Sequence, residues 1–205
     1  MGRILVVDDE PGIITLVRTV LKKEGHVVLG AASGEEALEM LKEEKPDLIL
    51  LDIMMPRLDG WETLARIREQ EHLRDVPVSM LTAKSLTPET VARPDIEQLI
   101  DYIQKPFTRQ SLIEKVNLIL SRLQRLSENE AAPGAGADSL FKEYTDIVKA
   151  EWLHESLLET LQQGLKGIDE PYEIEVAKEA IASEQLKLDE LKKKRKEIEK
   201  RIREK

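Results

Sequence analysis

The chain has 205 residues, a formal net charge of −9 and no cysteine. This length allows one ordinary domain and a smaller second one, and the lack of cysteine excludes a disulfide framework and thiolate metal sites. No apolar run approaches the roughly 18 residues of a membrane span, and the N-terminus enters a predicted strand without a signal peptide, so we expect a cytoplasmic protein with no membrane partner.

Short apolar runs bounded by turn residues predict the strands of an α/β sheet. They lie at 4–7, 27–29, 48–51, 78–81 and 102–104. Patterns with helical spacing lie between them, and the run LILL at 48–51 is apolar enough for a strand that is buried on both faces. Strands that alternate with helices favour a parallel sheet with crossover helices.

Polar residues follow or end four of these runs. Asp8 and Asp9 follow the first, Asp52 follows LILL, Thr82 ends the fourth strand and Lys105 follows the last. Because the carboxyl ends of parallel strands meet at one edge, we expect three carboxylates, one hydroxyl and one ammonium to lie together there. Each residue alone is equally well explained as a cap or turn residue, but five at strand ends favour a site.

The residue types in this cluster favour phosphoryl transfer. Three carboxylates within about 4 Å of one another repel by roughly 4 kcal/mol per pair at an effective dielectric near 20, which favours a bound divalent cation. Oxygen donors suit Mg²⁺, which also binds phosphate, and a lysine and a hydroxyl add further charge neutralisation. Asp52 would be the nucleophile that forms an aspartyl-phosphate.

This constellation, in this order, resembles the receiver domain of two-component response regulators, the CheY-like family. The resemblance implies a doubly wound five-stranded parallel sheet in the flavodoxin-like order, Mg²⁺ as cofactor and a cognate histidine kinase as partner. It implies that Asp9, Asp52 and the backbone carbonyl of Met54 hold the metal, with Asp8 assisting through water. By the same resemblance, Lys105 pairs with the phosphoryl oxygens.

The resemblance also implies roles for residues around the phosphate. Thr82 would hydrogen-bond to a phosphoryl oxygen and act with Tyr102 as a switch, although an ordinary, partly buried aromatic residue is an equally good interpretation of Tyr102. Met54 and Lys84 would tune dephosphorylation, and a thioether cannot orient an attacking water. The protein would be no enzyme beyond its own phosphorylation and dephosphorylation.

One stretch departs from the family pattern. Between Thr82 and Lys105, Pro88 is placed to start a helix and Pro94 to end it after about two turns, which predicts a short or displaced fourth helix. A final helix from Thr108 to about Leu126 would close a receiver domain of residues 1–126.

The remaining chain changes in composition. Residues 127–138, SENEAAPGAGAD, predict a flexible linker. Residues 139–205 predict an all-α helical hairpin, a coiled-coil interaction domain whose two helices are separated by a break at 164–171. The heptad spacing of its second helix is interrupted by Glu184 and Arg195.

Two classes of output remain open. The first is a protein-interaction tail that forms a homodimer through its helices and binds a downstream protein. The alternative is a receiver-controlled nucleic-acid-binding regulator that uses residues 192–205, where nine basic residues stand against three acidic ones. Because three glutamates interleave with these basic residues and aromatic residues are absent, we expect nucleic acid to be an unlikely partner.

Overall fold

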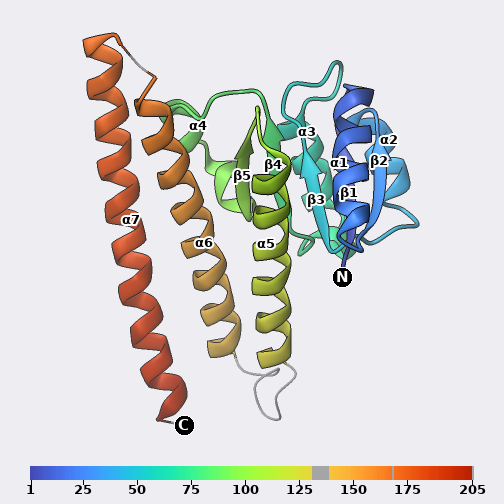
Figure 1. Ribbon diagram of the computed structural model, residues 1–205. Coiled ribbons are helices and arrows are strands. Elements are labelled where there is room, and N and C mark those ends of the chain that lie inside the picture. Colours follow the sequence, from blue (N-terminus) through green and yellow to red (C-terminus); the bar gives the residue numbers. More distant parts are fainter. Residues whose placement is uncertain (131–138, 168, 205) are drawn as a thin grey trace. The chain divides into compact units, whose positions relative to one another are not determined.

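The computed structural model describes residues 1–130, 139–167 and 169–204. The chain forms two compact units, which Figure 1 shows as a ribbon coloured along the sequence. The first unit contains residues 1–85 and 101–120, and the second contains residues 86–100 and 121–205.

The first unit is built on a five-stranded parallel sheet in the order β2-β1-β3-β4-β5. Its strands are β1 (Arg3–Val7), β2 (Val27–Ala31), β3 (Leu48–Leu51), β4 (Val78–Thr82) and β5 (Asp101–Gln104). Every residue of β3 is buried, as expected for a central strand covered on both faces. The predicted doubly wound α/β fold is therefore confirmed.

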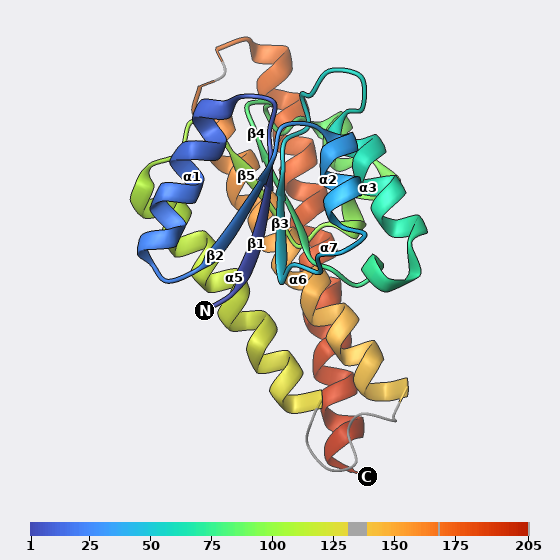
Figure 2. The same cartoon turned by 90° about the vertical axis from the view of Figure 1, so that its right-hand side faces the viewer.

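Helices cover the two faces of this sheet. They are α1 (Pro11–Lys23), α2 (Gly34–Met40), α3 (Gly60–Glu69), the short 3₁₀ helix η1 (Glu71–Leu73) and α5 (Arg109–Glu130), which continues into the second unit. Figure 2 shows α1 on one face and α2 with α3 on the other. Local sequence explains where they begin, because α1 has a proline in its first turn, Ser33 caps α2, and Asp59 and Glu62 form a capping box for α3.

Strand register brings the site residues to one edge of the sheet. Val7 pairs with Leu51 across β1 and β3. Beyond that pair, the amide of Asp52 donates to the carbonyl of Val7 at 2.9 Å, and the amide of Lys105 donates to the carbonyl of Thr82 at 2.7 Å. The residues that end these strands are therefore held by the ladder itself.

The second unit contains the short fourth helix and the tail. Its elements are α4 (Pro88–Val91), the 3₁₀ helix η2 (Pro94–Gln98), the end of α5, α6 (Ser139–Leu165) and α7 (Pro171–Arg203). The predicted short helix is confirmed, and it ends even before two turns are complete. Arg93 is extended, with ψ at 135°, because the proline that follows it disfavours the helical conformation.

Helices α6 and α7 form an antiparallel hairpin. Glu143, near the start of α6, pairs with Arg201 near the end of α7, whereas His154, further along α6, pairs with Glu184. Apolar side chains from both helices are buried: Leu140, Val148, Leu153, Leu157, Leu158, Leu161, Ala177, Leu188 and Ile198. The predicted all-α hairpin after residue 139 is therefore present.

Helix α5 is longer than its apolar pattern predicts. It runs to Glu130 rather than to about Leu126, so the first four residues of the predicted linker are helical. Residues 131–138, the rest of that linker, lie outside the described residues. Residues 86–100 and 121–126 belong to the second compact unit, although the sequence predicts them to be part of the receiver domain. The predicted boundaries at 126 and 139 therefore stay predictions. Every helix in the described parts of the chain is too short or too polar to span a bilayer.

Candidate phosphoryl-acceptor and metal site

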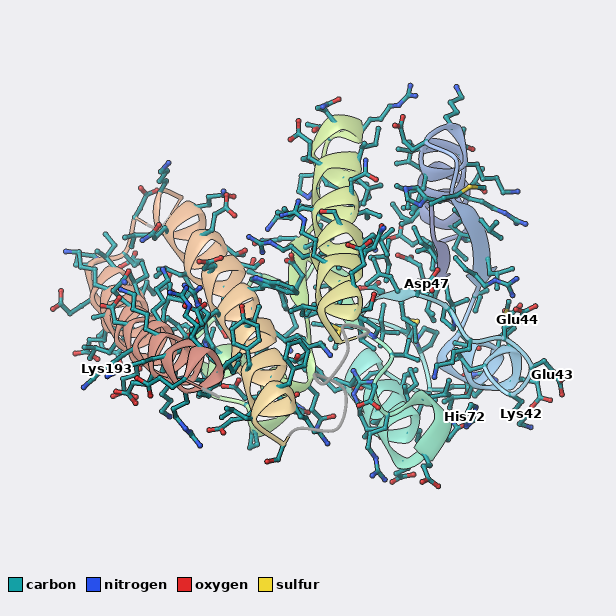
Figure 3. The ribbon with its side chains drawn as sticks, turned by 90° about the horizontal axis from the view of Figure 1, so that it is seen from below. Lys42, Glu43, Glu44, Asp47, His72 and Lys193 are labelled. Carbon is teal, nitrogen blue, oxygen red and sulfur yellow. The ribbon has the colours of Figure 1, made fainter. Side chains whose placement is uncertain are left out.

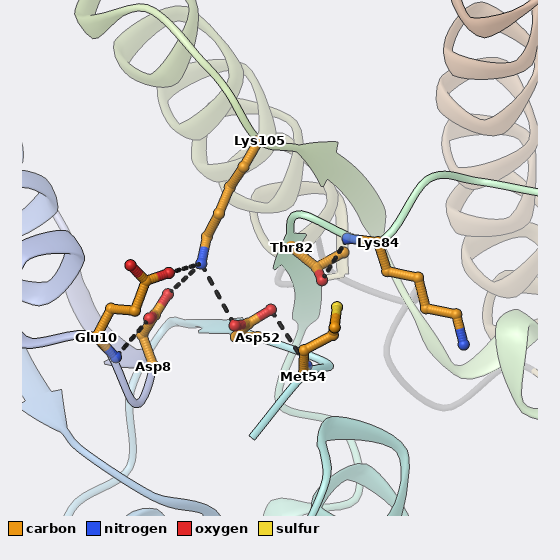
Figure 4. Close-up of polar contacts among 7 residues, drawn as sticks. All are labelled: Asp8, Glu10, Asp52, Met54, Thr82, Lys84 and Lys105. Atoms are coloured by element: carbon orange, nitrogen blue, oxygen red, sulfur yellow. Dashed lines mark hydrogen bonds and ion pairs between the residues drawn. The ribbon is translucent and has the colours of Figure 1, made fainter. Parts of the chain in front are cut away.

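Four of the five predicted strand-end residues, Asp8, Asp52, Thr82 and Lys105, lie at the carboxyl edge of the sheet in Figure 4. The ammonium of Lys105 lies 2.6 Å from a carboxylate oxygen of Asp8 and 3.3 Å from one of Asp52. Asp8 is fully buried, and Asp52 is 4% exposed. One lysine that follows β5 thus bridges the acids that follow β1 and β3.

Burial sets the electrostatics of this bridge. It raises the pKa of the Asp8 carboxyl, which the hydrogen bond and charge of Lys105 only partly oppose. Burial also disfavours the charged form of Lys105, but the hydrogen bond to Asp8 and the nearby carboxylate of Asp52 outweigh it, so its pKa is raised. The lysine is therefore a permanent positive charge beside Asp52.

The acids outnumber the single lysine. Carboxylate oxygens of Asp8, Asp9 and Asp52 lie within 4.8 Å of one another, and Asp9 is exposed. Three carboxylates and one ammonium leave an excess of negative charge at this edge of the sheet. Solvent reaches the cluster at Asp9, which is exposed. An oxygen-only donor set of this charge fits a hard divalent cation such as Mg²⁺, which keeps some of its waters.

Met54 and Lys84 lie on the open side of Asp52. The backbone amide of Met54 approaches the other carboxylate oxygen of Asp52 at 3.4 Å, while its side chain is largely exposed, at 62%. Both residues line a shallow depression together with Ile53, Met55 and Asp59. The two residues predicted to tune dephosphorylation therefore line one depression, and their role stays a prediction.

The two predicted switch residues share a partner that the sequence did not reveal. The hydroxyl of Thr82 accepts a hydrogen bond from the amide of Lys84 at 3.1 Å, and the hydroxyl of Tyr102 donates to the carbonyl of Lys84 at 2.8 Å. Tyr102 is fully buried rather than partly exposed, and burial raises the pKa of its phenol. A short sequence spacing could not show that the backbone of one residue, Lys84, contacts both side chains.

Two further residues shape the site without a sequence signal for their role. Glu10, largely exposed, lies 4.0 Å from the ammonium of Lys105 and adds to the negative charge. Gly60 lies against the backbone of Asp52, where a Cβ atom would be 2.2 Å from the carbonyl oxygen. The glycine in LDG therefore allows α3 to begin directly beside the acceptor, which the pattern marked only as a turn.

Solved structures of other proteins resemble this chain. The response regulator TrrA from Thermotoga maritima, solved in complex with Mg²⁺-BeF, is 37% identical and superposes with a TM-score of 0.52. The match covers 58% of this chain and 99% of that one. The likeness thus spans nearly all of a structure that holds Mg²⁺ and a fluoride of beryllium.

Relatives with longer chains share the same part of the protein. The alkaline phosphatase synthesis transcriptional regulatory protein PhoP of Bacillus subtilis is 42% identical over 120 residues, 58% of this chain and 49% of its own. The DNA-binding dual master transcriptional regulator RpaA of Synechocystis is 35% identical over 128 residues, 62% of this chain and 53% of its own. The chain therefore spans about half the length of these curated relatives.

A family model gives the assignment. The model of the response regulator receiver domain matches residues 4–117, more than half of the chain, and includes the whole sheet except Arg3, together with all five strand-end residues. No family model matches the C-terminal tail. On its fold, its site and this match, the chain belongs to the response regulator receiver domain family of two-component systems.

Proposed function

We propose that the protein accepts a phosphoryl group on Asp52 from a histidine kinase and that this modification controls the helical tail. The observation that carries the proposal is the bridge of Lys105 between Asp8 and Asp52, at 2.6 and 3.3 Å, beside an excess of carboxylates. In this function the chain catalyses only its own phosphorylation and dephosphorylation.

The reaction uses few groups of the protein. A carboxylate oxygen of Asp52 attacks the phosphorus, the bond from phosphorus to the donor breaks, and an acyl phosphate remains. Lys105 stabilises charge on the phosphoryl oxygens, and the hydroxyl of Thr82 offers a hydrogen bond. Asp8, Asp9, Asp52 and the backbone of Met54 would hold Mg²⁺, which supplies charge neutralisation when bound.

Incubation with acetyl phosphate and Mg²⁺, read by intact mass, tests this function. We expect one added phosphoryl group, and we expect its loss in Asp52→Asn. Asp101→Asn is a matched control, because Asp101 is equally buried, at 5% against 4% for Asp52, and begins rather than follows a strand. Undiminished labelling of Asp52→Asn would show that the acceptor lies elsewhere.

The lifetime of the aspartyl-phosphate follows from the residues around it. The Met54 thioether accepts hydrogen bonds only weakly and does not orient a water for attack on phosphorus. We therefore expect a long-lived phosphoryl group, and we expect Met54→Asn to shorten its lifetime, because a carboxamide orients an attacking water better than a thioether does.

The comparisons correct one sequence expectation about the output. Nucleic acid was expected to be an unlikely partner, but the relatives are named as transcriptional regulators, and RpaA is named as DNA-binding. That expectation is wrong, and its weak step was the weight given to the interleaved glutamates. Of these, Glu199 pairs with Arg195 at 3.0 Å and Glu204 with Lys200 at 3.7 Å, so they do not neutralise the remaining basic residues.

We therefore favour nucleic acid as the ligand of the basic end of α7. Lys193, Lys196, Lys200 and Arg203 are exposed and recur at helical spacing along one side of the helix. Figure 3 shows Lys193 pointing outward from α7, on the side away from α6. In the part of the chain that the structure describes, Lys193, Lys196 and Arg203 have no ion-pair partner, which leaves them available for phosphates.

Fluorescence anisotropy with double-stranded DNA tests this output. If these four cations contact phosphates, the logarithm of affinity should fall with the logarithm of salt at a slope of roughly −3 to −4. Changing all four to Gln should remove most of that slope. A control with Arg18, Lys22, Lys23 and Lys45 changed to Gln removes the same charge from exposed residues of the other unit. Equal losses in both variants would indicate only a non-specific effect of net charge.

A further inference from the structure

A buried histidine in the tail contacts carboxylates from two other elements of its unit. The Nδ1 atom of His154 on α6 lies 2.5 Å from Glu184 on α7, and its Nε2 atom lies 3.2 Å from Glu97 on η2. The imidazole is 2% exposed and Glu184 is 1% exposed, while Glu97 is half exposed. One side chain thus joins both helices of the hairpin to the stretch 86–100.

The charges around this histidine balance. Lys187 on α7 lies 2.8 Å from the second oxygen of Glu184, so two carboxylates face two cations when the imidazole is protonated. Burial by itself lowers the pKa of His154, but the hydrogen bonds to Glu184 and Glu97 outweigh it and raise the pKa to about 9. Among the described groups, Glu97, Glu184 and Lys187 are those that face the imidazole from η2 and α7.

The stretch 86–100 is attached to both units in different ways. It belongs to the compact unit of the tail, and its apolar residues Val91, Ile96, Leu99 and Ile100 are buried. Its two chain ends, however, emerge from the phosphoryl-acceptor unit, just beyond Lys84 and just before Tyr102. Those are the residues joined by the hydrogen bond from the Tyr102 hydroxyl, at 2.8 Å.

We propose that Glu97, His154 and Glu184 form a charged clasp that fastens the stretch 86–100 to helices α6 and α7, so that a change at the acceptor site is passed to the tail. The clasp stands on the geometry of the second unit alone. Its use in signalling rests on the proposed phosphorylation of Asp52. A hydroxyl of Thr82 that turned to a phosphoryl group would leave the amide of Lys84, two residues before the stretch begins.

Hydrogen exchange of the full-length protein, followed by mass spectrometry, tests the clasp first. His154→Gln and Glu184→Gln should speed exchange in peptides covering 88–98 by about tenfold or more, the usual effect of losing a hydrogen bond to a charged group. Glu179→Gln is the matched control, because it removes an exposed carboxylate from the same helix. Unchanged exchange in 88–98 for both clasp variants would overturn the proposal.

The same measurement with Mg²⁺ and beryllium fluoride tests the coupling. In the wild type we expect slower exchange around residues 52–60 together with altered exchange in 88–98 and α6, and in His154→Gln we expect only the first change. A response confined to 52–60 in the wild type would overturn the coupling and leave the proposed phosphorylation of Asp52 intact. No response anywhere would overturn both, while the clasp would still be decided by its own variants.

Discussion

The acceptor site and the clasp are both buried clusters of carboxylates around a cation, yet their charge balance differs. At the acceptor site, Asp8, Asp9 and Asp52 face the single ammonium of Lys105, and Asp9 is exposed. In the clasp, Glu97 and Glu184 face both His154 and Lys187. A cluster that has excess negative charge and is reached by solvent favours a bound cation. A cluster whose charges balance favours a fixed structural contact.

Removing Lys105 should have the largest effect of the changes proposed, and it tests the acceptor site in this comparison. We expect Lys105→Ala to slow phosphorylation by acetyl phosphate by about 100-fold, because it removes the fixed positive charge beside Asp52. Rates of intact-mass change measure this effect. Lys45→Ala, which changes an exposed lysine of the same unit, should phosphorylate at the wild-type rate.

Removing the histidine should damage stability rather than phosphorylation. We expect His154→Leu to destabilise the tail unit by about 3 kcal/mol, since Glu184 would keep a buried charge with fewer partners. Urea unfolding followed by circular dichroism measures the loss. The double change His154→Leu with Glu184→Leu should recover most of the stability, and failure to recover it would mean that packing, not charge, dominates the clasp.

Residue Gly60 offers a purely steric way to disturb the acceptor site. In Gly60→Ala the added methyl group would meet the backbone of Asp52 and displace it, with an expected loss of about 1–3 kcal/mol in stability. Phosphorylation should slow as well, because the acceptor would move relative to Lys105. Gly12→Ala is the control, since a Cβ atom there meets nothing within 4 Å.

The smallest expected effect is a pH dependence confined to the clasp. Because the pKa of His154 is raised from its ordinary 6.5 to about 9, its contribution to stability is complete below pH 6.5 and is lost as the pH rises through 9. We therefore expect the melting temperature to fall over this range in the wild type, and to fall less in His154→Gln. The imidazole resonance of His154 in NMR spectra should titrate near the same value.

The sequence predicts the acceptor site far better than it predicts the clasp. Asp8, Asp52 and Lys105 follow directly from short apolar runs, because the ends of parallel strands must meet. Thr82 and Tyr102 were assigned as a switch only by family resemblance, and their common contact with Lys84 depends on side-chain directions that no spacing encodes. For the same reason, the sequence does not decide how deeply Tyr102 is buried.

The sequence does not reveal the clasp, because polar residues on its helices look like interruptions of an apolar heptad pattern. Glu184 and Arg195 fall on the apolar seam of the last helix, where the heptad pattern marks them as interruptions. In the structure Glu184 pairs with His154, and Arg195 pairs with Glu151 at 2.8 Å. Polar residues on the facing seams of both helices are a signal that could have predicted these pairs. The third member, Glu97, comes from a distant part of the chain and had no such signal.

Calorimetric titration of the full-length protein with Mg²⁺ tests most directly whether charge balance separates the two clusters. We expect one ion per chain in the wild type, binding weakened at least about tenfold in Asp9→Asn, which loses one charged ligand, and unchanged binding in Glu184→Gln. Mg²⁺ binding that survives Asp9→Asn in full, or that is lost in Glu184→Gln, would contradict the assignment of the ion to the acceptor site.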